Sequence, residues 1–476
     1  MTREQLAEIG WPLGKSTIPR GVDLWVPFDR TVGVYGPQGS GKTLDLLTPA
    51  LLSAPGAALV TLTKPEDLFL TLDARAQDER PVHVLDPFDL APGVPQLIWD
   101  PIDGCEDSMT AERRAKAFTA GTVGGAVTRG TGDDAARFYA AEGAKVLQAY
   151  FHSAALAGAS LDDVLTWLSD PHNAGQPEEI LRTHPGAAPF WDGLLRGAIH
   201  GDDRTAGNTI TTVQQAMALF FQESIRRRCA PGPGRPAIDL KAAIEAGGTI
   251  YLLGRDDPYA SASPLMTAIA EHVLDTALGM AMASPYGRLC PSFLACLDEL
   301  PSTTPLPTLR TRIANERALG LSFIYAAQTW RQLVICYGED EARTMFGLTN
   351  NIVVFGGGKD IEFYKEISDL LGTTRVARRS FNLSHGAWGS SFYGDDVPVL
   401  RPEEIRRLPE RHALVVAENA KPFIARLSRC IDGKAGRALL SAQTEARSRA
   451  NRTRGGRRWR TNLHVFSLFL FRHRRR

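Results

Sequence analysis

One octapeptide near the amino terminus has the residue types and spacing that phosphate binding requires. It consists of Gly36, Pro37, Gln38, Gly39, Ser40, Gly41, Lys42 and Thr43, and it follows an apolar run that predicts a strand. The glycines let backbone N–H groups surround a phosphate, and a helix expected to begin at Leu44 adds partial positive charge. In this pattern Lys42 contacts the β- and γ-phosphates and the Thr43 hydroxyl binds Mg²⁺. The motif therefore predicts a strand–loop–helix unit that binds ATP with Mg²⁺.

A second apolar run, residues 293–297, ends in two adjacent carboxylates, Asp298 and Glu299. Phosphoryl transfer needs a carboxylate beside the metal ion, and Asp298 is placed to hold Mg²⁺, partly through water. Glu299 follows on the other side of the strand end, where we expect it to polarise the attacking water. The alternative is an acidic pair on the exposed end of a strand.

Two further polar positions are candidates for the same reaction. The apolar run of residues 321–327 ends at Gln328, which is predicted to sense the γ-phosphate; a simple polar strand cap is the alternative. The segment before this run carries Arg310, Arg312 and Arg317. An arginine there is expected to reach the ATP of a neighbouring subunit, a contact that contributes about 10³–10⁵ in rate where it is known. The alternative is a solvated helix face.

Seven short apolar runs define the fold class. They are residues 32–36, 57–63, 82–86, 248–254, 293–300, 321–328 and 351–357. Most are continuously apolar, which is typical of strands buried on both faces of a mainly parallel sheet. Helical stretches separate several of them, so the sequence predicts an α/β fold.

Between the third and fourth runs the strand signal nearly disappears and alanine-rich helical sequence takes its place. We therefore predict a discontinuous motor domain of residues 1–104 and 236–430. An inserted all-α domain occupies residues 105–235, and a Pro/Gly-rich segment, residues 229–236, leads back into the sheet.

Cysteine usage and hydropathy exclude several classes of protein. The six cysteines are scattered without a C-x-x-C pair, which indicates free thiols in a reducing compartment and no zinc site. No segment has the about 20 apolar residues that a membrane-spanning helix needs, and the amino terminus lacks the apolar region of a signal peptide. We expect a cytoplasmic protein, with the inner face of the cell membrane as an alternative location.

The net charge of +1 conceals an uneven distribution. Residues 447–476 contain eleven arginines and no acidic residue, so the remainder of the chain is acidic. Residues 431–476 are predicted to form a basic, mostly disordered tail. Three interpretations stay open for it: a nucleic-acid contact, an anionic membrane contact that uses the apolar residues 463–471, or an inert end.

In the order and spacing of its motifs, the chain resembles the TraG/TraD-type coupling ATPases of conjugation and type IV secretion. The resemblance runs from about Arg30 to Arg429. Beyond the phosphate loop, it rests on residues 63–66 (TKPE), 84–87 (VLDP), 99–103 (WDPID), 297–301 (LDELP), 327–328 (AQ), 332–333 (QL), 337–342 (YGEDEA), 367–372 (ISDLLG), 408–409 (LP) and 421–423 (KPF).

The resemblance implies a RecA-like P-loop motor with an inserted all-α domain, working as a homo-hexameric ring. Such a motor brings DNA, a relaxase or another secreted protein to a secretion channel or membrane-anchor protein. Arg317 best matches the family's arginine finger, and Arg30 matches a basic residue near the nucleotide. Family members usually begin with membrane-spanning helices, whereas this chain starts about 30 residues before the phosphate-loop strand. The alternatives are an ATP-gated adaptor that recruits a protein through the all-α domain, and a DNA translocase unrelated to secretion.

Overall fold

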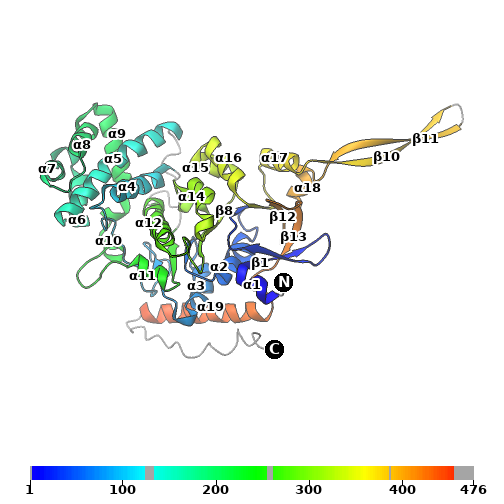
Figure 1. Ribbon diagram of the computed structural model, residues 1–476, viewed down its shortest axis with the longest axis horizontal. Helices are drawn as coiled ribbons and strands as arrows, with labels where there is room; N and C mark the ends of the chain where they lie inside the picture. The colour runs from blue at the N-terminus through cyan, green and yellow to red at the C-terminus, as the bar shows by residue number, and fades with distance from the viewer. Residues whose placement is uncertain (1–2, 124–132, 255–260, 385–386, 455–476) are drawn as a thin grey trace.

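The computed structural model describes residues 3–123, 133–254, 261–384 and 387–454 of the 476-residue chain. A central sheet is flanked by helices on both faces, a cluster of helices lies at one end, and a long hairpin projects from the other (Figure 1). The sheet and its helices hold every predicted catalytic residue.

The sheet has eleven strands in the order β2-β1-β13-β12-β9-β3-β8-β7-β4-β6-β5. Seven neighbouring strands, from β9 to β5, are parallel, and the four on the other side pair antiparallel. The seven predicted runs correspond to the parallel strands, so the predicted α/β class with a mainly parallel sheet is confirmed. The strands are β1 (Gly10–Ser16), β2 (Asp23–Pro27), β3 (Val32–Tyr35), β4 (Ala58–Leu62), β5 (Val82–Leu85), β6 (Thr249–Leu253), β7 (Phe293–Leu297), β8 (Leu321–Ala327), β9 (Asn351–Phe355), β12 (His412–Ala417) and β13 (Phe423–Leu427).

Two hydrophobic cores lie on opposite faces of this sheet, because successive residues of a strand point to opposite sides. Val34 packs into one core and Tyr35 into the other. The first face is covered by η1 (Thr43–Leu47), α2 (Thr48–Ser53), α3 (Pro65–Arg75) and α19 (Gly433–Arg454). The second is covered by α12 (Ser263–Ala283), α13 (Leu300–Thr303), α14 (Leu309–Asn315), α15 (Trp330–Tyr337), α16 (Glu339–Leu348) and α17 (Ile361–Leu371). The shorter helices are α1 (Arg3–Ile9), α11 (Leu240–Glu245), η6 (Arg317–Leu319) and α18 (Pro402–Arg406).

In the segment predicted as an all-α insert, the described regular elements are helices joined by loops, apart from an isolated β-bridge between Gly232 and Arg235. Its helices are α4 (Ser108–Val123), α5 (Asp133–Ala157), α6 (Leu161–Ser169), α7 (Gly175–Thr183), α8 (Trp191–His200), α9 (Asp203–Ala216) and α10 (Glu223–Cys229). They form the group at the left of Figure 1. Their buried residues belong to the same core as α12 and the second face of the sheet, so the insert and the motor share one hydrophobic core.

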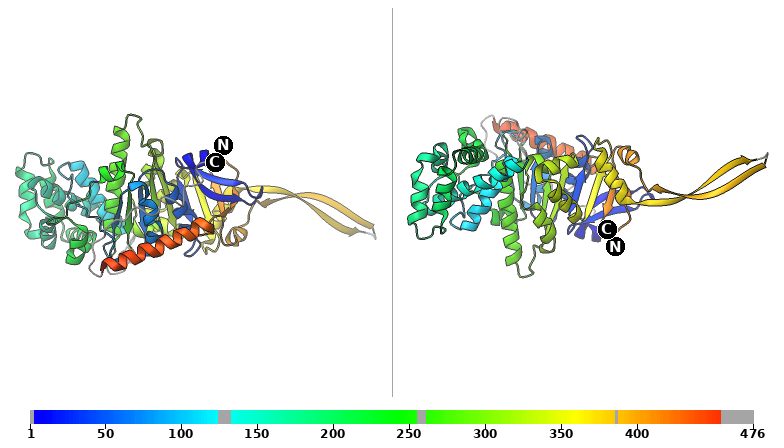
Figure 2. Two further views of the ribbon diagram at one scale, coloured as in Figure 1. Left: turned by 90° about the horizontal axis from the view of Figure 1, so that it is seen from below. Right: turned by 90° about the horizontal axis from the view of Figure 1, so that it is seen from above.

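A two-stranded hairpin of β10 (Thr373–Ser384) and β11 (Ala387–Pro398) projects from the side of α17 and α18. Figure 2 shows it extending far from the rest of the molecule in two further views. The sequence did not predict this hairpin.

The carboxyl-terminal region departs from the prediction of a mostly disordered tail. Residues Gly433–Arg454 form the long helix α19, which lies along α3 (Figure 1). Ala446 and Ala450 are buried there, and Arg449 forms an ion pair with Asp73 of α3. The prediction is therefore wrong for this part of the tail, because two small alanines allow the helix to lie close to the body. Residues 455–476 lie outside the described residues.

All six cysteines are among the described residues, and each is a free thiol. Among the described residues, no helix combines the length and the apolar character needed to cross a bilayer.

The close approach of α19 gives a testable expectation at Gly93. This glycine has a φ of +87°, and a Cβ atom there would lie 2.0 Å from the carbonyl oxygen of Ala450. Gly93→Ala should therefore lower stability by about 1–3 kcal/mol more than the left-handed backbone alone requires. Gly234→Ala is the matched control, because its φ is +69° and nothing lies within 4 Å of the added Cβ. Chemical denaturation measures both; equal losses would contradict the docking of α19.

Candidate active site

The phosphate-binding motif forms the loop after β3, a strand that lies near the middle of the sheet between β8 and β9. Gly39 and Gly41 have φ values of +79° and +100°, which side chains other than glycine rarely adopt. The helix that follows begins as the π-helical turn Thr43–Leu47, one residue before the predicted start. Lys42 is 6% exposed, and its ammonium donates to the carbonyl oxygens of Gly36 (2.6 Å) and Pro37 (3.1 Å). The lysine therefore lies inside the loop that it is predicted to serve.

This loop has the donors that a phosphate group needs. The Ser40 hydroxyl is buried and has no hydrogen-bond partner among the described residues. An added Cβ at Gly36 would lie 2.9 Å from that hydroxyl, so the glycine leaves room for the loop to curl. Burial lowers the pKa of Lys42, while the nearby Asp298 and Glu299 oppose that shift. A bound anion would satisfy Ser40 and compensate the buried lysine charge, so these residues fit a nucleotide phosphate.

The metal-side residues also meet. The Thr43 hydroxyl donates to the Asp298 carboxylate at 2.7 Å, although 255 residues separate them. Asp298 follows β7 and is 5% exposed. Burial raises its pKa, and the hydrogen bond from Thr43 opposes that rise. A hydroxyl and a carboxylate are hard oxygen ligands of the kind Mg²⁺ prefers.

Glu299 and Gln328 are brought together in a way that the sequence did not indicate. The Gln328 side-chain amide lies 2.9 Å from both carboxylate oxygens of Glu299. Glu299 has a φ of +51°, a left-handed conformation that costs a residue with a side chain about 1–2 kcal/mol. Gln328 follows β8, which lies between β3 and β7. The contact therefore ties the predicted catalytic carboxylate, at the end of β7, to the end of β8, the strand next to β3.

Two predicted arginines lie at the amino ends of the strands, opposite the phosphate loop. Arg30 precedes β3 and Arg317 precedes β8, whereas the phosphate loop follows the end of β3. Each arginine approaches the Glu418 carboxylate at 3.7 Å, and Asn350 donates to the same carboxylate. The length of β3 separates Arg30 from the phosphate loop of its own chain, and the length of β8 separates Arg317 from the end of β8 that carries Gln328. Within one chain, neither arginine lies beside the loop, so the prediction that Arg30 helps to bind the nucleotide stays a prediction.

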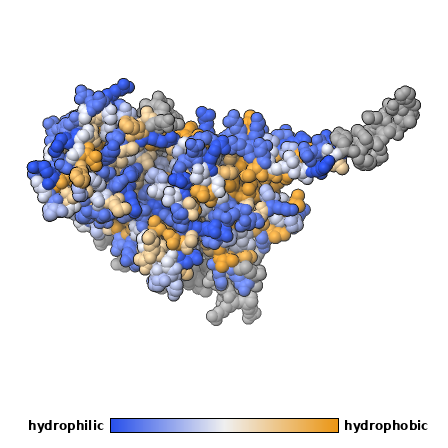
Figure 3. All heavy atoms as spheres, turned by 45° about the horizontal axis from the view of Figure 1, so that its top comes forward, coloured by the Kyte–Doolittle hydropathy of each residue, from blue (hydrophilic) through white to orange (hydrophobic). Residues whose placement is uncertain are grey.

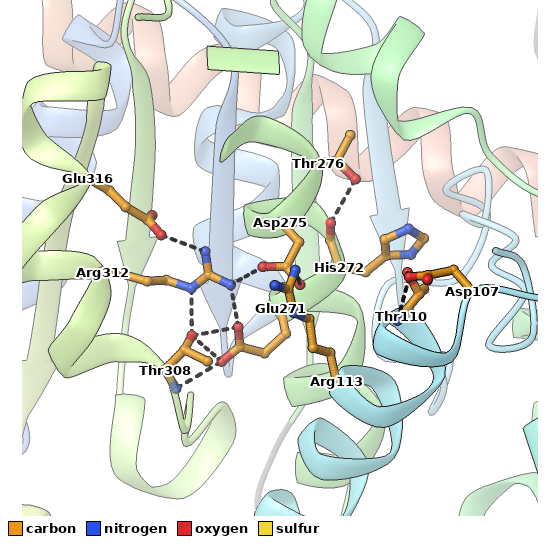
Figure 4. A network of polar contacts seen from close by, with 10 residues as sticks. All are labelled: Asp107, Thr110, Arg113, Glu271, His272, Asp275, Thr276, Thr308, Arg312 and Glu316. Atoms are coloured by element: carbon orange, nitrogen blue, oxygen red, sulfur yellow. Dashed lines mark hydrogen bonds and ion pairs between the residues drawn. The ribbon is translucent and has the colours of Figure 1, made fainter. Parts of the chain in front are cut away.

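A buried ion-pair network lies immediately before Arg317 (Figure 4). Arg312 of α14 has a side chain that is 3% exposed, and it contacts Glu271 and Asp275 of α12 and Glu316. Arg113 of α4 lies 3.9 Å from Asp275. The network therefore connects the inserted helices, through α12, to the turn that carries Arg317.

The sequence-based search missed three charged residues around the phosphate loop. Asp45, which is fully buried, pairs with Arg429 at 2.8 Å, and an added Cβ at Gly41 would lie 3.2 Å from that guanidinium. Asp67, in the first turn of α3, lines a small cavity with Thr43. Burial raises the pKa of Asp67 to about 6, and the nearby Asp298 adds to the rise. Asp67 directly follows the TKPE motif, so the sequence could have indicated it. Asp45 and Arg429 are 384 residues apart, so no sequence motif could have indicated their pairing.

These features define the class of the protein. A glycine-rich loop after a central parallel strand, with an acidic pair on the strand two positions away and a polar residue on the strand between, is the site of a P-loop NTPase.

Comparison with known proteins identifies the family. Two protein-family models match the chain. The family described as "Type IV secretory system Conjugative DNA transfer" matches residues 13–159, and the family described as "TraM recognition site of TraD and TraG" matches residues 292–410. Together they account for more than half of the chain. The chain belongs to the TraG/TraD-type family of conjugative coupling proteins, as its motifs predicted.

Individual relatives are distant. The conjugal transfer protein TraG of Escherichia coli is 22% identical over 404 residues, which are 79% of this chain and 61% of that protein. The chain thus spans about three-fifths of the length of this curated relative. The coupling protein TrwBΔN70 matches with a TM-score of 0.62 and 20% identity, covering 85% of this chain and 87% of that one. TrwB in complex with ADP and Mg²⁺ matches with a TM-score of 0.60, 20% identity and the same coverage. At these identities the structures show the shared fold.

The buried network generates a prediction about pH. Burial raises the pKa of Glu316 from 4.5 to about 7, against the opposing effect of Arg312. A carboxyl group with a raised pKa contributes stability fully below its ordinary pKa and loses it as the pH rises through 7. Glu316→Gln should therefore match the wild type at pH 5 and exceed it by about 1–2 kcal/mol at pH 8. Thermal unfolding at both pH values tests this. Glu339→Gln, at a half-exposed glutamate, is the control, and the same pH-dependent gain there would contradict the assignment.

Proposed function

We propose that this protein is an ATP-hydrolysing motor that couples DNA, or a DNA–protein substrate, to a conjugative type IV secretion channel. The observation that carries the proposal is the convergence of Lys42, Thr43, Asp298, Glu299 and Gln328 at one edge of the sheet. The family matches support the connection to conjugation. TrwB, which has the same fold, is known in complex with ATP and GTP analogues and with ADP and Mg²⁺.

The contacts suggest what each side chain does. Lys42 would exchange the carbonyl oxygens of Gly36 and Pro37 for the β- and γ-phosphates. Thr43 and Asp298 would hold Mg²⁺, which neutralises charge on the phosphates when it is bound. Glu299 would orient the attacking water and accept its proton. The Gln328 amide donates to both oxygens of Glu299, and a γ-phosphate would offer that amide another acceptor, which would leave Glu299 freer to bind the attacking water.

The positions of the arginines favour a ring. Arg317 lies at the end of β8 away from its own phosphate loop, so in this proposal it acts on the nucleotide of another subunit. A homo-hexamer, the assembly that the family resemblance implies, would place one subunit's edge beside the next subunit's loop. In this proposal Arg317 completes the neighbour's site.

The partners follow from the proposed role. The motor, residues 1–104 and 236–430, would move DNA through the ring, working at the cytoplasmic end of the channel. The inserted helices, residues 105–235, would face the relaxase or other secreted protein and a channel or anchor protein. The shared core between these helices and the motor supports mechanical coupling, because a displacement of one cannot leave the other unchanged.

Two substitutions separate nucleotide binding from hydrolysis. Lys42→Ala should abolish ATP hydrolysis and weaken nucleotide binding, because it removes the cation inside the loop. Glu299→Gln should keep nucleotide binding and lower kcat by about 10²–10⁴-fold, the usual contribution of a general base. Equilibrium binding of a fluorescent ATP analogue and steady-state phosphate release measure the two effects. Lys15→Ala, at an exposed lysine, is the control. Full activity in Glu299→Gln would exclude the assigned base.

DNA stimulation tests the motor function itself. We expect single- or double-stranded DNA to raise the ATPase rate of the assembled protein. ATP hydrolysis that DNA leaves unchanged would exclude translocation.

Mixed assemblies test the role of Arg317. An Arg317→Ala subunit mixed with a Lys42→Ala subunit should recover part of the activity that each lacks, because a site between them can combine an intact loop with an intact arginine. Failure of the mixture to recover ATPase activity would place Arg317 outside catalysis.

A further inference from the structure

A groove on the second face of the sheet lies outside the nucleotide site. It encloses about 410 Å³ between α15, α16 and α17. Trp330, Phe346 and Phe363 line it, and the Trp330 and Phe363 rings stack with centroids 6.0 Å apart. Leu370 at its rim is 56% exposed. Figure 3 shows an apolar area on the surface beside the base of the hairpin, in the region of these helices. The groove therefore offers an aromatic floor to an apolar ligand.

The rim of the groove is acidic. Glu366 and Asp369 line it, together with Arg343. Arg343 is already paired with Glu366 at 3.0 Å and with Glu339 at 2.6 Å. These four side chains carry a net charge of −2, so the groove favours an apolar ligand that brings positive charge.

One segment of this chain has that chemistry. Seven of residues 463–471 are Leu, Val or Phe, and four arginines occur among residues 472–476. No acidic residue occurs after Glu445. Phosphate contacts would use the arginines but give no reason for the apolar run, whereas an aromatic groove with an acidic rim accounts for both.

The geometry favours exchange between copies. Helix α19, from which this segment continues, lies against α3 on the first face of the sheet. The groove lies among α15, α16 and α17 on the second face. Figure 1 shows these three helices on the side of the molecule away from α19. The last described helix before this segment thus lies on the face opposite the groove of its own chain, which favours the groove of another copy.

We propose that the groove binds residues 463–476 of a second copy of this chain. The apolar residues pack on the floor formed by Trp330 and Phe363, and the terminal arginines pair with Glu366 and Asp369. The interaction is an interface between subunits and does not depend on ATP hydrolysis.

The first experiment measures the contact directly on the full-length protein. A tail variant replaces four apolar side chains with serine, so that its own tail no longer competes: Phe466→Ser, Leu468→Ser, Phe469→Ser and Phe471→Ser. A fluorescent peptide of residues 461–476 should bind this variant. Adding Glu366→Lys and Asp369→Lys should weaken binding about tenfold or more, because both anionic partners are reversed.

The control changes the same amount of charge elsewhere. Glu179→Lys with Glu223→Lys reverses two exposed glutamates of the inserted helices, and binding there should stay unchanged. Equal weakening by both pairs would show non-specific attraction and overturn the proposal. A peptide that binds duplex DNA but not the protein would make the segment a nucleic-acid contact and would also overturn it.

Complementation tests whether the contact forms between copies. Sedimentation velocity should show self-association of the wild type and weaker association of both the tail variant and the groove variant, Glu366→Lys with Asp369→Lys. A mixture of the two variants should associate, because one provides an intact groove and the other an intact tail. A mixture that sediments as the separate variants do would overturn exchange between copies.

Discussion

The hydrogen bond between Thr43 and Asp298 depends on a constraint that organises the rest of the molecule, namely the register of three parallel strands. Tyr35 of β3 pairs with Ala327 of β8, and Leu297 of β7 pairs with Tyr325 of β8. Because the strands are parallel and end at nearly the same height, the phosphate loop, Gln328 and the acidic pair all lie at the carboxyl ends of the strands. A shift in register would separate the Thr43 hydroxyl from its carboxylate partner and Gln328 from Glu299. The helices on both faces fix this register, since every residue of these three strands is buried.

The sequence predicted the parallel part of the sheet, which is seven of its eleven strands. Continuous apolar runs marked β3 to β9 because such strands have no polar face. Strands β1 and β2 escaped notice because Gly10, Pro12 and Gly14 interrupt the first and solvent reaches most of the second. Helix α19 escaped because its buried contact uses alanines within otherwise polar sequence. A small side chain that allows close approach leaves no hydrophobic signal.

Sequence motifs predicted those site residues that are close together in the chain. The phosphate loop and the acidic pair are each contiguous in sequence, so their chemical roles could be predicted from the sequence alone. The contact between Gln328 and Glu299, the Asp45–Arg429 pair and the position of Arg30 depend on strand order and chain direction. Arg30 is six residues from Gly36 in sequence, yet the extended strand β3 places the two residues at its opposite ends. Proximity in sequence is therefore a poor guide to proximity in a site when a strand intervenes.

Tyr35 has a position whose consequence extends beyond packing. It is the last residue of β3, directly before Gly36. The centroid of its ring lies 5.1 Å from that of Phe363, 6.2 Å from that of Trp330 and 6.2 Å from that of Phe346. Tyr35 thus packs against the three aromatic residues that line the groove, while the next residue, Gly36, begins the phosphate loop. Any free energy by which an occupant of the groove changes nucleotide affinity must equal that by which nucleotide changes the occupant's affinity. If a second copy of the chain occupies the groove, its binding and the binding of nucleotide would share one coupling free energy, with Tyr35 and Gly36 as the covalent link between the two sites.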